Sequence, residues 1–113
     1  MEVLNMIFEL QILGGLLFTL AGLFQYFFPP KKINSFYGYR TGTSMKSQEN
    51  WDLAQKISAK KLIQSGVFIL LAGILMHFFT PSEKIKMFSS IGLILLGVFY
   101  ILYTTEQALT HKK

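Results

Sequence analysis

The chain has 113 residues, of which 51% are hydrophobic and 15% are charged, and its formal net charge is +5. Soluble domains usually carry about 25% charged residues, so the composition argues against an ordinary soluble protein. The basic residues gather beside apolar segments, which indicates membrane topology and not a nucleic-acid partner. The chain contains no cysteine, which excludes disulfides and thiolate metal sites.

Three apolar segments are each long enough to cross a bilayer, which requires roughly 17–25 apolar helical residues. These segments are residues 6–28, 62–79 and 85–105. Backbone polar groups cannot go unpaired in lipid, so each segment should be a helix. The sequence therefore predicts an all-α fold, a three-helix membrane bundle that forms a single integral membrane domain over residues 1–113. A soluble bundle of three buried helices is the alternative.

The first span is expected to end at Pro29-Pro30, because proline cannot continue a helix. A polar loop follows at residues 33–46, and Gly38 and Gly42 allow unusual backbone angles within it. Since the rest of the chain is mostly apolar, we expect function to lie in the polar stretch of residues 33–51, which contains this loop.

A helix is expected to begin after Ser47, whose hydroxyl suits an N-cap. The residues that follow are amphipathic: Trp51, Ala54 and Ser58 share one face, whereas Gln55 lies on another. No helix breaker separates this amphipathic extension from the second span. We therefore expect one continuous helix that runs from the extension to the end of that span.

The third span is expected to end in a short polar tail, in which Glu106 can neutralise nearby lysines. Glycines in the first two spans are spaced seven residues apart, so each pair lies on one helix face where another helix can approach closely. The two pairs are Gly15 with Gly22 and Gly66 with Gly73. Packing within the chain and a homodimer interface both fit this pattern.

The basic residues predict the orientation of the chain. Seven lie between the first and second spans, two lie between the second and third, and two end the chain. The positive-inside rule then places the N-terminus outside, the loop in the cytoplasm and the C-terminus inside. On this topology Glu9 and His77 lie on the outer side, where they could pair across the bundle. Either a structural role or a toxin-contact or proton-linked role fits them.

The loop and the start of the next helix combine hydrogen-bond donors, a fixed cation at Arg40 and an indole at Trp51. Such a set near a helix N-terminus can attract an anion or bind a peptide or protein partner. A purely structural role is the alternative, in which Arg40 bonds backbone carbonyls or lipid phosphate and Trp51 anchors the membrane interface. Gln25 and Gln64 are expected to form an interhelical hydrogen bond. The sequence contains no cofactor motif and no metal-ligand constellation.

The spacing of the loop residues resembles that of the SdpI family of toxin-immunity membrane proteins. Six residues carry the resemblance: Asn34, Gly38, Arg40, Thr41, Ser47 and Trp51. Two positions depart from the family pattern, since Gly42 stands where proline is usual and Gln55 stands where histidine is common.

The resemblance implies a multi-pass protein of a bacterial cytoplasmic membrane that works without catalysis. It would protect the cell against a secreted antimicrobial peptide, sequester a cytoplasmic regulator at the membrane, or do both. A subunit of an oligomeric transporter or channel is the alternative, although glycine and large apolar residues fill the middle of each span. A lipid-modifying enzyme would need more acid, base and metal-ligand groups on one side than the sequence offers.

Overall fold

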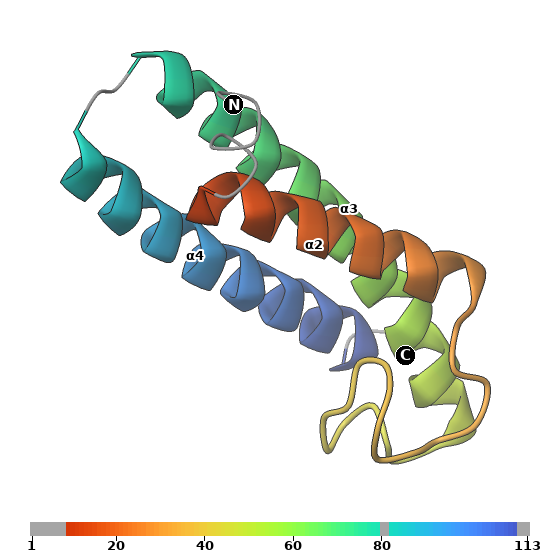
Figure 1. Ribbon diagram of the computed structural model, residues 1–113. Helices are drawn as coiled ribbons and strands as arrows, with labels where there is room; N and C mark the ends of the chain where they lie inside the picture. Colours follow the sequence, from red (N-terminus) through yellow and green to blue (C-terminus); the bar gives the residue numbers. More distant parts are fainter. Residues whose placement is uncertain (1–8, 80–81, 111–113) are drawn as a thin grey trace.

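The computed structural model of the chain describes residues 9–79 and 82–110. Over these residues it consists of three α-helices and contains no strand: α2 spans Leu10–Phe27, α3 spans Gln48–Phe79 and α4 spans Glu83–Thr110 (Figure 1). Each of the three is long and apolar enough to cross a membrane. The predicted all-α, three-span architecture is therefore confirmed.

Helix α3 begins where the sequence predicts. The Ser47 hydroxyl accepts a hydrogen bond from the Asn50 N–H at 3.0 Å, which is the geometry of an N-cap. The helix then continues without a break for 32 residues, so the amphipathic extension and the second span are one helix. The first span ends at Phe27, just before the two prolines. The part of that span before residue 9 lies outside the described residues.

Helix α4 is longer than the predicted third span and ends at Thr110. The expectation of a polar tail starting at Glu106 is therefore wrong for residues 106–110. The hydroxyls of Thr104 and Thr110 donate to carbonyls four residues earlier, at 2.7 and 3.0 Å, so these polar residues fit within the helix. The loop also binds Glu106 directly, and the last turns are thereby held against the bundle.

Helix α2 packs closely along α3, and α4 lies alongside both helices with its C-terminal end next to the loop (Figure 1). The glycine pairs explain how close α2 and α3 come. A Cβ on Gly66 would lie 2.5 Å from the Thr19 nitrogen, and a Cβ on Gly15 would lie 2.6 Å from the Leu70 nitrogen. Gly22 and Gly73 likewise face the opposite helix. All four glycines thus serve packing within the chain, and at Gly15, Gly22 and Gly66 a Cβ would lie within 3.0 Å of the opposite helix.

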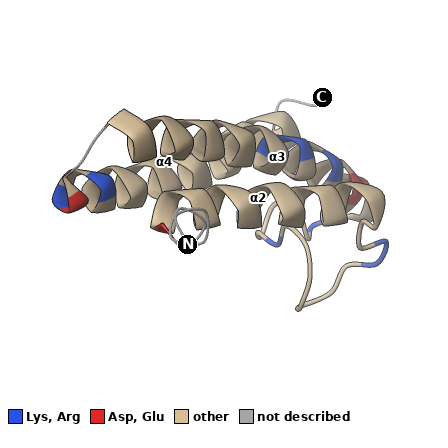
Figure 2. Cartoon of the chain, turned by 45° about the horizontal axis from the view of Figure 1, so that its top comes forward, with Lys and Arg blue, Asp and Glu red and all other residues tan. Residues whose placement is uncertain are grey.

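The charged side chains gather at the two ends of the bundle. Figure 2 shows them on the loop and the first part of α3 at one end and around the start of α4 at the other. Large apolar side chains between these ends are exposed, among them Leu20, Phe68, Leu95 and Phe99. An apolar belt between two charged ends is the surface that a lipid bilayer requires.

Candidate functional site

The loop between α2 and α3 has a defined fold that begins at Asn34. The Asn34 Oδ1 accepts hydrogen bonds from the N–H groups of Phe36 and Tyr37, each at 2.8 Å, and its Nδ2 donates to the Lys32 carbonyl at 2.9 Å. An asparagine that bonds the backbone two and three residues ahead stabilises a tight turn. Asn34 therefore sets the path of the loop.

Gly38 brings the loop backbone against α3. It has φ of +99°, a region that side-chain-bearing residues rarely adopt. A Cβ at this position would lie 2.4 Å from the Gln55 Oε1 and 2.6 Å from the Pro30 Cγ. Both the backbone angle and the space therefore require glycine here.

Gln55 lies beneath the loop with 2% of its surface exposed, so the prediction that it faces away from the buried side is wrong. Its Oε1 accepts a hydrogen bond from the Tyr39 N–H and its Nε2 donates to the Tyr39 carbonyl, both at 2.7 Å. The loop folds back over this face of α3 and covers it. The helical periodicity of the α3 sequence does not predict that a loop covers this face.

Gln25 connects α2 to the same cluster. Its Nε2 donates to the Gln55 carbonyl at 3.0 Å and to the Ser58 hydroxyl at 2.8 Å. Gln64 accepts instead from the Tyr100 hydroxyl at 3.4 Å. Each glutamine therefore makes an interhelical hydrogen bond, but the two do not bond to each other.

Glu106 joins the loop to α4. Its Oε2 accepts hydrogen bonds from the Tyr39 hydroxyl at 2.7 Å and from the Thr41 hydroxyl at 2.8 Å. Burial raises the pKa of the Tyr39 phenol well above its ordinary value of 10.0, and the hydrogen bond and negative charge of Glu106 raise it further. Tyr39 therefore stays protonated and remains a donor to the carboxylate.

Thr41 and Ser44 close the second turn of the loop. The Thr41 N–H donates to the Ser44 hydroxyl at 2.8 Å, and the Ser44 N–H donates to the Thr41 hydroxyl at 3.1 Å. Arg40, between Tyr39 and Thr41, is exposed and donates from Nη1 to the Ser35 carbonyl. A guanidinium carries five N–H donors, so most of its binding capacity stays on the surface of the loop.

Trp51 fastens the end of the first span to α3. It is fully buried, and its Nε1 donates to the Pro30 carbonyl at 2.6 Å. The alternative in which Trp51 anchors the membrane interface is therefore wrong. An indole inside the protein leaves no ring surface for lipid headgroups.

The other end of the bundle carries the predicted pair of Glu9 and His77, and the pairing is confirmed. The Glu9 Oε2 and the His77 Nδ1 are 2.5 Å apart, and the Lys86 Nζ lies 3.8 Å from the same carboxylate oxygen. Beside them is a cavity of about 290 Å³, whose polar lining includes Gln11 and Ser90. The side chain of Gln11 bonds both α3 and α4 there.

The six motif residues therefore do not converge on one point. Asn34 and Ser47 shape the backbone, Gly38 and Trp51 close the loop onto α3, Thr41 reaches α4 and Arg40 faces outward. Three residues at the centre of these contacts are not among the predicted site residues: Tyr39, Gln55 and Glu106. Two of them left a signal, since Gln55 occupies the position where histidine is common and Glu106 is an acidic residue at the edge of a span. No group of His, Asp and Glu side chains suited to a metal ion occurs in the described part of the chain.

The fold and the loop define a multi-pass helical membrane protein whose interhelical loop is fastened to α3 and α4. The chain belongs to the SdpI/YfhL protein family, whose model matches residues 31–104. Over 65 residues it is 46% identical to the uncharacterized protein YfhL of Bacillus subtilis (strain 168). That match covers 58% of this chain and 59% of the relative, less than two thirds of its length. No solved structure matches the chain.

Proposed function

We propose that the protein is an immunity-type membrane protein that acts by binding, without catalysis, and that its loop recruits a regulator protein to the membrane. One observation carries the proposal. The inward-facing loop residues form hydrogen bonds that hold the loop to α3 and α4, whereas the side chains of Arg40 and Phe36 face outward and are exposed. Phe36 is 92% exposed. Arginine and aromatic side chains on a rigid support are the types that dominate the binding energy of protein interfaces.

The proposed orientation puts this loop in the cytoplasm, where a regulator can reach it. Because the chain has no cysteine, single cysteines can be introduced without removing native ones. Ser35→Cys in the loop and Lys84→Cys at the start of α4 should report opposite sides of the membrane. In intact cells a membrane-impermeant maleimide should label Lys84→Cys and spare Ser35→Cys until the cells are opened. The reverse pattern would overturn the orientation.

Recruitment is tested by copurification of soluble proteins with the full chain from cells of its source bacterium. We expect Phe36→Ala combined with Arg40→Ala to lose the copurifying regulator. Lys60→Ala, which removes an exposed basic side chain from α3, serves as the control and should retain it. A regulator that copurifies equally with the double variant would exclude the loop as its binding surface.

A second function is favoured by the polar cluster at the other end of the bundle. Glu9, His77 and Lys86 lie together beside a cavity there, on the side that the proposed orientation exposes to the exterior. A secreted antimicrobial peptide would reach this end first. We expect Glu9→Gln and His77→Gln to lower the survival of cells treated with the secreted peptide fraction of the source bacterium, and to leave recruitment through the loop intact. Unchanged survival with both variants would exclude this cluster from immunity.

A further inference from the structure

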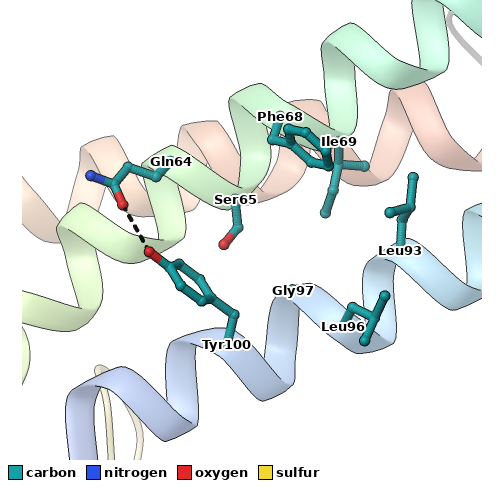
Figure 3. A pocket seen from close by; sticks show the side chains of 8 residues that line it. All are labelled: Gln64, Ser65, Phe68, Ile69, Leu93, Leu96, Gly97 and Tyr100. Atoms are coloured by element: carbon teal, nitrogen blue, oxygen red, sulfur yellow. Dashed lines mark hydrogen bonds between the residues drawn. The ribbon is translucent and has the colours of Figure 1, made fainter. Parts of the chain in front are cut away.

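A groove of about 330 Å³ runs between α3 and α4 at the lipid-facing surface (Figure 3). Phe68 on α3 and Leu96 on α4 form its rims and are 64% and 65% exposed, while Ile69 is buried at its floor. Gly97 leaves the floor open, because a Cβ there would already lie 3.2 Å from the Ile69 Cδ1. The volume lies at the lower end of the range for small-ligand sites.

One end of the groove is polar and carries a cation. Tyr100 lines this end, and its hydroxyl donates to the Gln64 Oε1 at 3.4 Å, as the dashed line in Figure 3 shows. The Lys61 Nζ lies 3.4 Å from the same hydroxyl and 5.5 Å from the centre of the Tyr100 ring. The cation thus sits at the mouth of the groove, toward the end of the bundle that bears the loop.

Ser65 supplies an independent sign of a ligand. It is only 7% exposed, and Figure 3 shows its hydroxyl directed from α3 toward α4, into the groove. Serine in a helix commonly donates to the carbonyl four residues earlier, as Ser90 does to Lys86 at 2.5 Å. Among the described residues, Ser65 has no such partner. The hydroxyl is open to the groove, so an acceptor atom bound there would give it the hydrogen bond that it lacks.

From the loop end of the bundle inward, the groove therefore offers the Lys61 cation, then the hydroxyls of Tyr100 and Ser65, then apolar walls. The cation and the Ser65 donor are four residues apart on α3, or about 6 Å along the helix. A phospholipid presents the complementary groups in the same order: phosphate, ester carbonyl, acyl chain. We propose that the groove binds one acyl chain of an anionic phospholipid, with the phosphate at Lys61 and an ester carbonyl accepting from Ser65. This lipid site is separate from the proposed recruitment and immunity functions.

Native mass spectrometry of the full chain tests the proposal. The purified, delipidated protein is incubated in detergent with phosphatidylglycerol or with phosphatidylcholine of the same acyl chains. We expect phosphatidylglycerol to remain bound in preference to phosphatidylcholine. Lys61→Gln should weaken phosphatidylglycerol binding about fivefold, which is the usual worth of one basic residue at an anionic membrane surface. Ser65→Ala should weaken the binding of both lipids about threefold, because the ester carbonyl is common to both.

Lys60→Gln is the matched control, since Lys60 is an exposed cation at the adjacent position of α3, about 100° around the helix from Lys61, which contacts Tyr100. It should bind phosphatidylglycerol as the unchanged protein does. Leu96→Trp and Leu95→Trp provide a second pair, because both residues are exposed on α4 and only Leu96 lines the groove. Equal lipid binding across each pair, or no preference between the two lipids, would overturn the proposal. A lipid-free dimer that only Leu96→Trp disrupts would overturn it as well, by assigning the groove to a second copy of the chain.

Discussion

The side-chain amide of Gln55 bonds both polar groups of the Tyr39 backbone, accepting from its N–H and donating to its carbonyl at 2.7 Å each. One side chain in α3 thus makes the two hydrogen bonds to the Tyr39 backbone that a neighbouring strand or turn would otherwise make. Because the Tyr39 hydroxyl also bonds Glu106, Tyr39 connects the loop to both α3 and α4.

Gln55→Glu tests that dependence with almost no change in shape. A carboxylate can accept from the Tyr39 N–H but cannot donate to its carbonyl, and it places a charge in a buried site. We expect the free energy of unfolding in detergent to fall by about 1–3 kcal/mol. Gln107→Glu is the control, because Gln107 is exposed and its side chain donates to the Tyr103 hydroxyl, within the same helix, at 2.8 Å. Equal losses in the two variants would contradict the role given to Gln55.

Gly38→Ala should destabilise the loop through both backbone strain and a clash with the Gln55 Oε1. The positive φ alone costs about 1–3 kcal/mol for a residue other than glycine. Gly42→Ala offers a matched comparison within the same loop, since a Cβ there meets nothing within 4 Å and its φ is not in the positive range. The midpoint of thermal unfolding should therefore be lower for Gly38→Ala than for Gly42→Ala, although both variants carry the same glycine-to-alanine substitution. A Gly38→Ala protein as stable as Gly42→Ala would refute the assigned backbone geometry.

The raised pKa of Tyr39 predicts a loss of stability in alkali. The folded state holds the phenol in its protonated form, whereas the unfolded chain releases the proton near the ordinary value of 10.0. The contribution of Tyr39 is therefore complete below pH 10 and is lost as the pH rises through the folded-state pKa. Unfolding measured from pH 8 upward should show a steeper decline for the unchanged protein than for Tyr39→Phe. Parallel curves would show that the Tyr39 phenol ionises as easily in the fold as outside it.

Thr105→Val should stabilise the protein. Thr105 is fully buried, and its hydroxyl is without a hydrogen-bond partner in the described part of the chain. Valine has nearly the same shape and removes the unsatisfied group, which is worth about 1 kcal/mol or more. Thr104→Val removes a hydroxyl that does donate, to the Tyr100 carbonyl at 2.7 Å, and should bring no such gain. A lower unfolding midpoint for Thr105→Val would contradict the assignment.

The contact of Glu9 with His77 predicts a coupling that single variants cannot reveal. A double-mutant cycle with Glu9→Gln and His77→Gln should give an interaction free energy of about 1 kcal/mol, since both side chains are partly exposed. The same cycle with Lys86→Gln in place of His77→Gln should give less, because the Lys86 Nζ is 3.8 Å from the carboxylate. Additive losses in the first cycle would show that the pair is not formed in solution.

The three helices and the cap at Ser47 could be predicted from the sequence because they depend on local rules. Hydropathy over about 20 residues identifies a span, and the residue type at one position identifies a cap. The pairing of Glu9 with His77 was also predictable, because topology alone places two distant residues at the same membrane side.

The cluster beneath the loop could not be predicted, because it depends on where the loop folds. Gln55 looks solvent-facing within its own helix, and only the position of Gly38 and Tyr39 buries it. Glu106 follows the apolar run of the third span and therefore resembles the start of a tail. Its hydrogen-bond partner Tyr39 lies 67 residues earlier in the chain, a contact that no local pattern encodes.

The burial of Trp51 has a practical consequence. It is the only tryptophan in the sequence, and its indole N–H holds the Pro30 carbonyl at the point where the loop begins. Its emission spectrum therefore reports the separation of the loop from α3, and no other indole contributes to the signal. A shift to longer wavelength would mark that separation in real time, in detergent or in vesicles, and no added dye is needed.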